Sequence, residues 1–217
     1  MQTIIKDTHS SPDAAVIWLH GLGADGNDFV PAIPHLQLAQ DLKVRFVFPS
    51  APERAVTINN GMQMRSWYDI KAMLPQRVTD EQQLQESVEQ MAQLVADLVD
   101  QGIAAKRIIV VGFSQGGAVA YELALTTSSN VAGVAAMSTY LPRSLTGEQC
   151  LAGRSLAILS IHGDHDNVVP CALGENGVAQ LKDLGFNPQW HTFAMDHEVT
   201  TASLMLLGEW ITAQLAN

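Results

Sequence analysis

The sequence has 217 residues, of which 47% are hydrophobic, and it carries 12 basic against 22 acidic residues for a formal net charge of -10. This length supports one large hydrophobic core and predicts a single domain over residues 1–217. The excess of negative charge repels phosphate backbones and anionic lipid surfaces, so it argues against a nucleic-acid partner.

The two cysteines, Cys150 and Cys171, do not form a CxxC pair. They provide neither a disulfide framework nor a zinc or redox motif, so we expect two reduced thiols. No uninterrupted apolar run reaches the ~18 residues of a membrane span, and the N-terminus does not resemble a signal peptide. We therefore expect a cytoplasmic protein without stable membrane insertion.

Short apolar runs alternate with longer amphipathic stretches along the chain. This pattern is typical of an α/β fold with a mostly parallel sheet and covering helices. The near-continuous apolar runs predict strands that are buried on both faces. These strands are residues 14–19, 44–48, 107–111, 131–137 and 156–161, and a further strand is predicted at residues 189–193.

The clearest helical pattern covers residues 80–101, where apolar side chains recur at steps of three and four. Thr79 and Gln82 fit a capping box at its start, and Gly102 fits a C-terminal stop. Further helices are predicted after Asn27, Ser114, Pro170 and His197.

The pattern Gly-x-Ser-x-Gly surrounds Ser114, with Gly112 and Gly116 at its ends and Gly117 after it. In the hydrolase elbow, the serine stands on a sharp turn between a strand and a helix, and small neighbours let the backbone pass closely. The pattern alone is more often a structural glycine turn. Here a predicted strand precedes it and a predicted helix follows, so we predict that Ser114 is a nucleophile.

A serine hydroxyl needs a base to take its proton and an acid to orient that base. In folds with the hydrolase elbow, the acid follows the serine in sequence and the histidine follows the acid. Of the seven histidines, His197 follows the last predicted strand on a loop at the carboxyl edge of the sheet. Asp164 and Asp166 both qualify as the acid, and a turn-forming role is the alternative for either. We assign the turn to Asp164 and the orienting role to Asp166, although spacing barely separates them.

The oxyanion of a tetrahedral intermediate needs hydrogen-bond donors. On this fold, one donor is the backbone N–H after the nucleophile, here that of Gln115. The glycine-rich segment after the first predicted strand offers the second, the N–H of Leu22. Without the elbow, that segment is better explained as a plain connection before a helix.

Five segments, in this order and spacing, resemble the bacterial carboxylesterase and acyl-protein thioesterase family. They are His20-Gly21-Leu22-Gly23, Ser66-Trp67-Tyr68-Asp69-Ile70, Gly112-Phe113-Ser114-Gln115-Gly116-Gly117, Gly163-Asp164-His165-Asp166 with Val169-Pro170, and His197. The resemblance implies an α/β-hydrolase fold with helices on both faces and little cap domain, no metal or cofactor, and hydrolysis of carboxylic esters or thioesters. It selects Asp166 over Asp164 and places Leu22 and Gln115 in the oxyanion hole. Asp196 departs from the pattern, because the family usually has glycine before the catalytic histidine.

Residues 49–79 are predicted to be irregular, and loops of this length in compact domains are usually functional. Met73 and Leu74 are predicted to line a groove for an acyl chain, and Leu141 the opposite wall. For Trp67, lining the groove and filling the core beneath the loop are equally good interpretations.

The leading hypothesis is a carboxylesterase that forms an acyl-enzyme on Ser114 and acts on a small-molecule ester or thioester, with a lipid or an acylated protein as further candidate substrates. The alternative within the class is an acyl-protein thioesterase or a lysophospholipase. From another class, the alternative is a catalytically silent member of the fold that binds an apolar ligand or a protein. An exposed apolar loop is equally consistent with burial in a homodimer.

Overall fold

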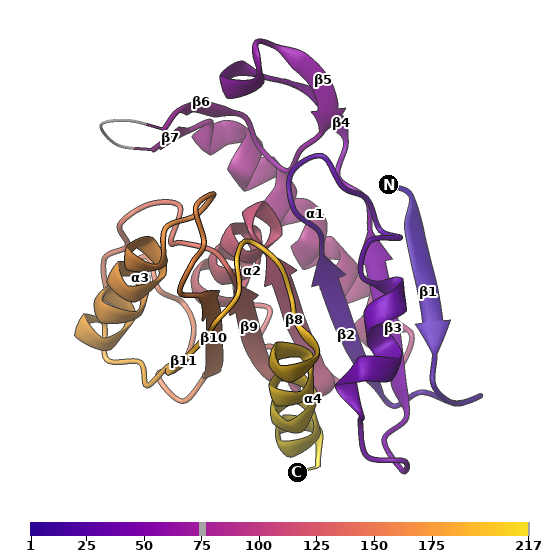
Figure 1. The fold of residues 1–217 in the computed structure, drawn as a ribbon. Helices are drawn as coiled ribbons and strands as arrows, with labels where there is room; N and C mark the ends of the chain where they lie inside the picture. The colour runs from indigo at the N-terminus through magenta and orange to yellow at the C-terminus, as the bar shows by residue number, and fades with distance from the viewer. Residues whose placement is uncertain (74–76, 217) are drawn as a thin grey trace.

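The computed structural model describes residues 1–73 and 77–216. The centre of the molecule is a seven-stranded sheet in the order β1-β3-β2-β8-β9-β10-β11 (Figure 1). Neighbouring strands are parallel, except that β1 runs antiparallel to β3. The strands are β1 (Thr3–Asp7), β2 (Ala14–Leu19), β3 (Val44–Pro49), β8 (Ile108–Phe113), β9 (Gly133–Met137), β10 (Ala157–Gly163) and β11 (Gln189–Phe193).

Helices cover both faces of this sheet (Figure 1). One face carries α1 (Glu81–Asp100), α2 (Gln115–Thr126) and α3 (Cys171–Asp183). The other carries α4 (Thr201–Leu215) and the 3-10 helix η1 (Val30–Leu36). The predicted α/β class, with a mostly parallel sheet between two helical layers, is confirmed.

The strand β2 illustrates how the apolar runs build two cores. All six of its residues are buried. Its odd-numbered residues join the apolar cluster on the side of α1 and α2, and its even-numbered residues join the cluster on the side of α4. Alternate side chains of a strand point to opposite faces, so a run that is apolar throughout is stable only between two helical layers.

Residues 49–79 are more ordered than the sequence predicted. Residues 49–73 and 77–79 form two antiparallel strand pairs above the carboxyl edge of the sheet, which we call the hairpins (Figure 1). The hairpins pair β4 (Glu53–Val56) with β5 (Met62–Arg65) around the 3-10 helix η2 (Thr57–Asn59), and β6 (Ile70–Ala72) with β7 (Val78–Thr79). Strands this short show no sustained alternation of apolar and polar residues, so the pattern does not reveal them.

Three other elements differ from the predictions. The strand β1 was not predicted, because three of its five residues are exposed and its sequence has no apolar run. The N-cap of α1 is Asp80 and not Thr79, since the Asp80 carboxylate accepts a hydrogen bond of 3.0 Å from the N–H of Gln83. The helix predicted after Asn27 is the 3-10 helix η1, which contains Pro34.

The carboxyl ends of the parallel strands meet at one edge, which Figure 1 shows beneath the two hairpins. The turn after β8 and the loops after β10 and β11 therefore lie together, although more than 80 residues separate Ser114 from His197. Within the described residues, no helix is both long enough and apolar enough to cross a membrane.

Two helical glycines test the packing of the outer helices. An added Cβ on Gly208 of α4 would lie 1.7 Å from the carbonyl oxygen of Leu36, whereas on Gly177 of α3 its nearest contact would be 3.5 Å away. We expect Gly208→Ala to reduce the free energy of unfolding by about 2 kcal/mol or more, because backbone must move. Gly177→Ala should raise it by roughly 0.5 kcal/mol through helix propensity. Urea unfolding of both variants checks the pair, and equal midpoints would contradict this account of α4 packing.

Candidate active site

The nucleophile elbow depends on an unusual backbone conformation at Ser114. This residue has φ 53° and ψ -119° between β8 and α2, a conformation that costs a non-glycine residue free energy. The residues two positions before and after it are glycines for a steric reason. A Cβ on Gly112 would lie 2.3 Å from the carbonyl oxygen of Gly116, and one on Gly116 would lie 2.5 Å from that of Leu19. Glycine at both positions lets β8, α2 and β2 approach closely enough to hold the turn.

Three side chains from separate loops form one chain of hydrogen bonds. The Nε2 atom of His197 lies 2.9 Å from Ser114 Oγ, and its Nδ1 atom lies 2.7 Å from Asp166 Oδ2. A carboxylate oxygen only accepts, so Nδ1 carries the proton of the neutral ring and Nε2 is left to accept from the serine hydroxyl. The arrangement has the geometry of a nucleophile, a base and an orienting acid.

The structure separates the two candidate acids. Asp166 is 5% exposed, and its second oxygen accepts hydrogen bonds from the N–H groups of Val168 and Val169 at 2.9 and 2.8 Å. Asp164 is exposed, and its carboxylate lies 3.4 Å from His165 rather than beside His197. The fixed and buried carboxylate is therefore the one that contacts His197.

A second buried histidine lies beside the same carboxylate. The Nε2 atom of His162 lies 2.8 Å from the carbonyl oxygen of Val169 and 3.6 Å from Asp166 Oδ2. Burial lowers the pKa of His162. A neutral His162 leaves the negative charge of Asp166 available to His197.

Two backbone donors flank Ser114. The Leu22 N–H has no hydrogen-bond acceptor among the residues that the structure describes. Gln115 is the first residue of α2, so its N–H has no acceptor within the helix. Leu22 and Gln115 line the same cavity as Ser114 and His197. Both predicted oxyanion residues thus lie at the serine with unused donors.

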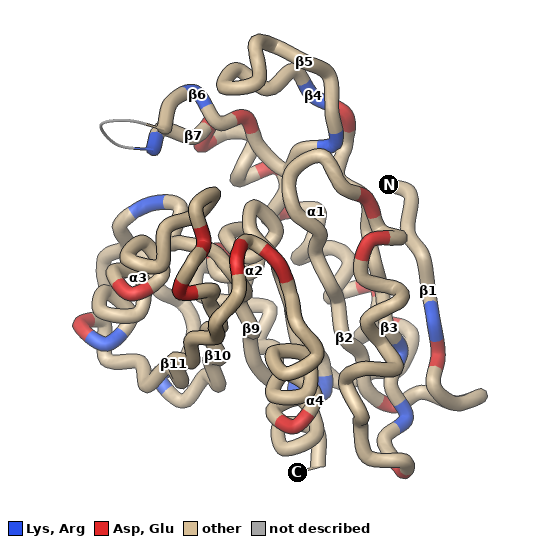
Figure 2. Tube along the Cα trace, in the orientation of Figure 1, with Lys and Arg blue, Asp and Glu red and all other residues tan. Residues whose placement is uncertain are grey.

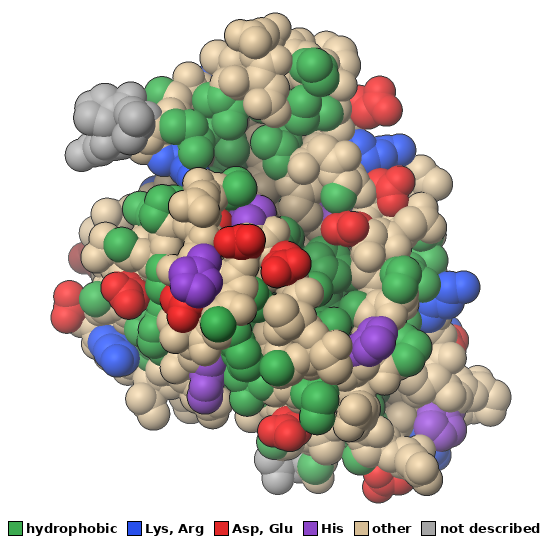
Figure 3. Space-filling model, in the orientation of Figure 1, with side chains coloured by type: hydrophobic (Ala, Val, Ile, Leu, Met, Phe, Trp, Pro, Cys, Tyr) green, Lys and Arg blue, Asp and Glu red, His purple; other side chains and the backbone are tan. Residues whose placement is uncertain are grey.

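The cavity at Ser114 has a volume of about 350 Å³ and lies beneath the hairpins. Figure 3 shows a hollow on this side, with hydrophobic side chains along the wall that the hairpins form. The lining residues are Gly21, Leu22, Ala24, Asp28, Ile58, Ile70, Met73, Arg77, Phe113, Ser114, Gln115, Tyr140, Val168, Val169 and His197. A larger cavity of about 610 Å³ lies between β1 and α1 and contains none of the three hydrogen-bonded residues.

The predicted substrate-binding residues divide between the cavity and the core. Met73 lines the cavity, but Trp67 is fully buried and does not, because its ring lies beneath the hairpins. Leu141 packs toward Gly177 of α3 instead, because the chain turns away after Tyr140. Leu74 lies outside the described residues.

Several lining residues were missed by the sequence reasoning. Ile58 and Ile70 come from the hairpin region, whose strands had no visible pattern, and Val168 follows the acid within its loop. Tyr140 directly precedes Leu141, the residue that was predicted to form the opposite wall. Which side chains face the serine depends on their position in a short hairpin, and the composition of the segment does not reveal that position.

Charged groups also border this cavity. Several acidic residues lie on the loops at the carboxyl edge (Figures 2 and 3). Asp28 lines the cavity, and desolvation raises its pKa. On the hairpin side, the Arg77 guanidinium lies 4.0 Å from the centre of the Tyr140 ring. Within the described residues, no group of three or more His, Cys, Asp and Glu side chains is placed to hold a metal ion.

Comparisons with known proteins identify the family to which the chain is similar. The family described as phospholipase/carboxylesterase matches residues 2–215. Acyl-protein thioesterase 1 of Neurospora crassa is 34% identical over 213 residues, which cover 93% of this chain and 87% of that protein. Acyl-protein thioesterase 1 homolog 1 of Dictyostelium discoideum is 31% identical over 223 residues, covering 99% of each.

The crystal structure of Arabidopsis thaliana SOBER1 superposes with a TM-score of 0.85 at 26% identity, covering 93% of this chain and 99% of that one. The family match spans nearly the whole sequence, and the relatives are similar over nearly their full lengths. The chain therefore belongs to the phospholipase/carboxylesterase family, whose members are serine hydrolases of carboxylic esters and thioesters with the α/β-hydrolase fold.

Proposed function

We propose that the protein is a carboxylesterase that cleaves esters or thioesters of apolar acyl groups through an acyl-enzyme on Ser114. The observation that carries the proposal is the hydrogen-bond chain from Ser114 through His197 to Asp166, which opens onto a cavity with apolar walls. A catalytically silent binding protein would not need these three side chains to be hydrogen-bonded in this order.

In the first half of the reaction, Ser114 Oγ attacks the carbonyl carbon of the substrate while His197 Nε2 takes the hydroxyl proton. The Asp166 carboxylate holds the ring and stabilises its protonated form. The N–H groups of Leu22 and Gln115 stabilise the oxyanion. The tetrahedral intermediate then expels the alcohol or thiol, which receives the proton from His197, and the acyl group stays on the serine.

The second half repeats these steps with water. His197 takes a proton from the water molecule that attacks the acyl carbonyl, and it returns the proton to Ser114 Oγ as the ester bond to the enzyme breaks. The carboxylic acid leaves the cavity. Each proton therefore passes through one histidine, and the site needs no additional acid or base.

The apolar wall supports an acyl chain as the group that the enzyme retains. Met73, Ile58 and Ile70 come from the hairpin region and line the cavity with Ser114. Methionine adapts to varied apolar shapes, which suits a broad esterase. The names of the relatives favour an acyl-protein thioesterase as the second candidate, and a lysophospholipase differs from both only in what leaves. We also propose a cytoplasmic location, and a homodimer formed through the apolar hairpins as one assembly.

Ser114→Ala tests the nucleophile. We expect kcat to fall by on the order of 10⁶-fold, as for other serine enzymes of this mechanism. A fluorophosphonate probe should label the native protein and leave the variant unlabelled. Equal labelling of the two proteins would refute the assignment of Ser114.

Asp166→Asn tests the acid, with Asp164→Asn as its matched control in the same loop. Loss of the Asp166 charge should lower kcat by on the order of 10⁴-fold, because the imidazolium loses its partner and the ring its tautomer. The exposed Asp164 does not contact His197, so its variant should stay within about twofold of the native rate. The reverse order of the two losses would mean that the wrong carboxylate has been assigned.

The acyl group is tested by kcat/KM across a series of acyl lengths, with matched oxygen esters and thioesters. If the hairpin wall binds the acyl chain, kcat/KM should rise with chain length, by up to about fourfold for each buried CH₂. A decline beyond acetyl would contradict the acyl-binding role of this wall. A sharp preference for long-chain thioesters would favour the thioesterase over the carboxylesterase.

A further inference from the structure

Residues 66–68, between the two hairpins, contact the side chain of Gln115. The Gln115 Oε1 atom accepts a hydrogen bond of 2.8 Å from the backbone N–H of Trp67. Its Nε2 group donates to Ser66 Oγ at 3.0 Å and to the carbonyl oxygen of Tyr68 at 2.6 Å. Gln115 is 2% exposed, so no water competes for these groups. Its side chain is therefore fixed to this segment at both ends of the amide.

The indole of Trp67 contacts the other side of the site. Its Nε1–H donates to the carbonyl oxygen of His20 at 2.9 Å, and the two rings lie with their centres 5.1 Å apart. His20 directly precedes the segment that carries Leu22. Trp67 thus reaches Gln115 through its backbone and the Leu22 segment through its side chain.

The ring of His20 in turn fixes the orientation of the peptide group between Gly21 and Leu22. Its Nε2 atom accepts from the N–H of Ala51 at 3.0 Å, so the ring proton is on Nδ1, which donates to the carbonyl oxygen of Gly21 at 2.7 Å. Burial lowers the pKa of His20, which favours this neutral form. The Gly21 carbonyl and the Leu22 N–H belong to one trans peptide group and point in opposite directions. Fixing the carbonyl toward His20 therefore directs the Leu22 N–H away from it.

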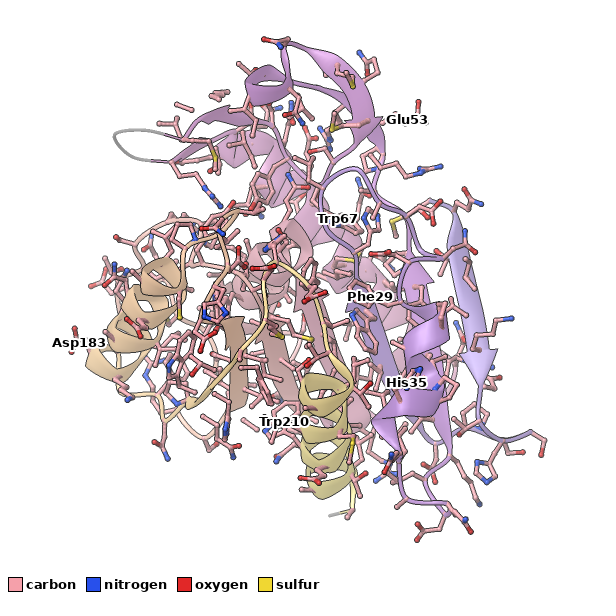
Figure 4. The ribbon with its side chains drawn as sticks, viewed as in Figure 1. Phe29, His35, Glu53, Trp67, Asp183 and Trp210 are labelled. Atoms are coloured by element: carbon pink, nitrogen blue, oxygen red, sulfur yellow. The ribbon has the colours of Figure 1, made fainter. Side chains whose placement is uncertain are left out.

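The 66–68 segment itself has little freedom to move. The carbonyl oxygen of Trp67 accepts a hydrogen bond from Ser87 Oγ on α1. The carbonyl oxygen of Arg65, just before the segment, accepts from the Gly23 N–H at 2.9 Å, which adds a second link to the Leu22 segment. Trp67 and Ser87 are both fully buried. Figure 4 shows Trp67 between the hairpins and the carboxyl edge of the sheet.

We propose that Trp67 is a positioning residue that sets the relative placement of the two oxyanion donors, the N–H groups of Leu22 and Gln115. The inference rests on the proposed function, because it assumes that these groups receive the oxyanion. Donors stabilise developing charge well only if they are already in place when the charge forms. If either N–H group shifts, the enzyme stabilises the transition state less well, while substrate binding in the apolar cavity is unchanged.

Trp67→Phe is the direct test, because it removes the indole N–H and keeps an aromatic ring. Trp210→Phe on α4 is the matched control. Trp210 is also buried, its Nε1 has no hydrogen-bond partner among the described residues, and it contacts Gly133 at the start of β9, the edge opposite the serine (Figure 4). Rates are expressed per active serine, titrated with a fluorophosphonate, so that any unfolded fraction cancels.

For Trp67→Phe we expect kcat to fall on the order of 10- to 100-fold with KM nearly unchanged. The affinity for an alkyl boronic acid, which forms a tetrahedral adduct on the serine, should fall by the same factor. Trp210→Phe should leave kcat, KM and the boronate affinity within about twofold. Native kcat in Trp67→Phe, equal losses in both variants, or a loss confined to KM would each overturn the positioning role.

Gln115→Met provides a second route to the same result if Trp67→Phe does not fold. This variant keeps the backbone N–H of Gln115 and removes the amide that residues 66–68 hold. It should show the same loss in kcat and boronate affinity, and native values would overturn the proposal. Failure of the proposed function itself is recognised separately, because Ser114→Ala would then retain the activity of the native protein.

Discussion

The close approach of three backbone segments at Ser114 is the constraint on which the site depends. The end of β8, the first turn of α2 and the end of β2 come so near that a single Cβ on Gly112 or Gly116 would overlap a carbonyl oxygen. This contact holds Ser114 in a positive-φ conformation that an isolated turn would not keep. The two buried cores on either face of the sheet provide the rigidity, since neither helical layer can move without exposing apolar side chains. The same approach brings the Leu22 segment against the start of α2.

Around this contact, buried polar groups form continuous networks. Asp166 accepts from two backbone N–H groups as well as from His197, and residues 66–68 link Gln115 to His20. Such groups are costly to bury unless each finds a partner, so a satisfied network favours one arrangement over its alternatives. The apolar side chains of the hairpins above the site need no specific hydrogen-bond partners, so their packing does not select one arrangement. This difference explains why the reaction chemistry follows from the geometry more directly than the choice of acyl group does.

The sequence predicted the parts of the molecule that rest on strong local patterns. Five strands buried on both faces, the helix near residues 80–101 and the elbow at Ser114 each have a distinct signal, and the order of parallel strands brings Asp166 and His197 to the same edge. The strand β1 and the hairpins were missed because they are short and partly exposed. Trp67 illustrates a different limit. An aromatic residue in an apolar loop predicts burial or substrate contact, but the hydrogen bonds of its indole and backbone depend on residues 47 and 48 positions away in sequence.

The central claim is that acyl transfer passes through Ser114, and trapping the intermediate tests it most directly. A p-nitrophenyl ester has a good leaving group, so deacylation should limit turnover and the acyl-enzyme should accumulate. Acid quenching during steady-state turnover, followed by proteolysis and peptide mass spectrometry, locates the acyl group. We expect the added mass on the peptide that contains Ser114, at the Ser114 position. Continued turnover with an unmodified Ser114 peptide, or with the acyl group on another side chain, would contradict it.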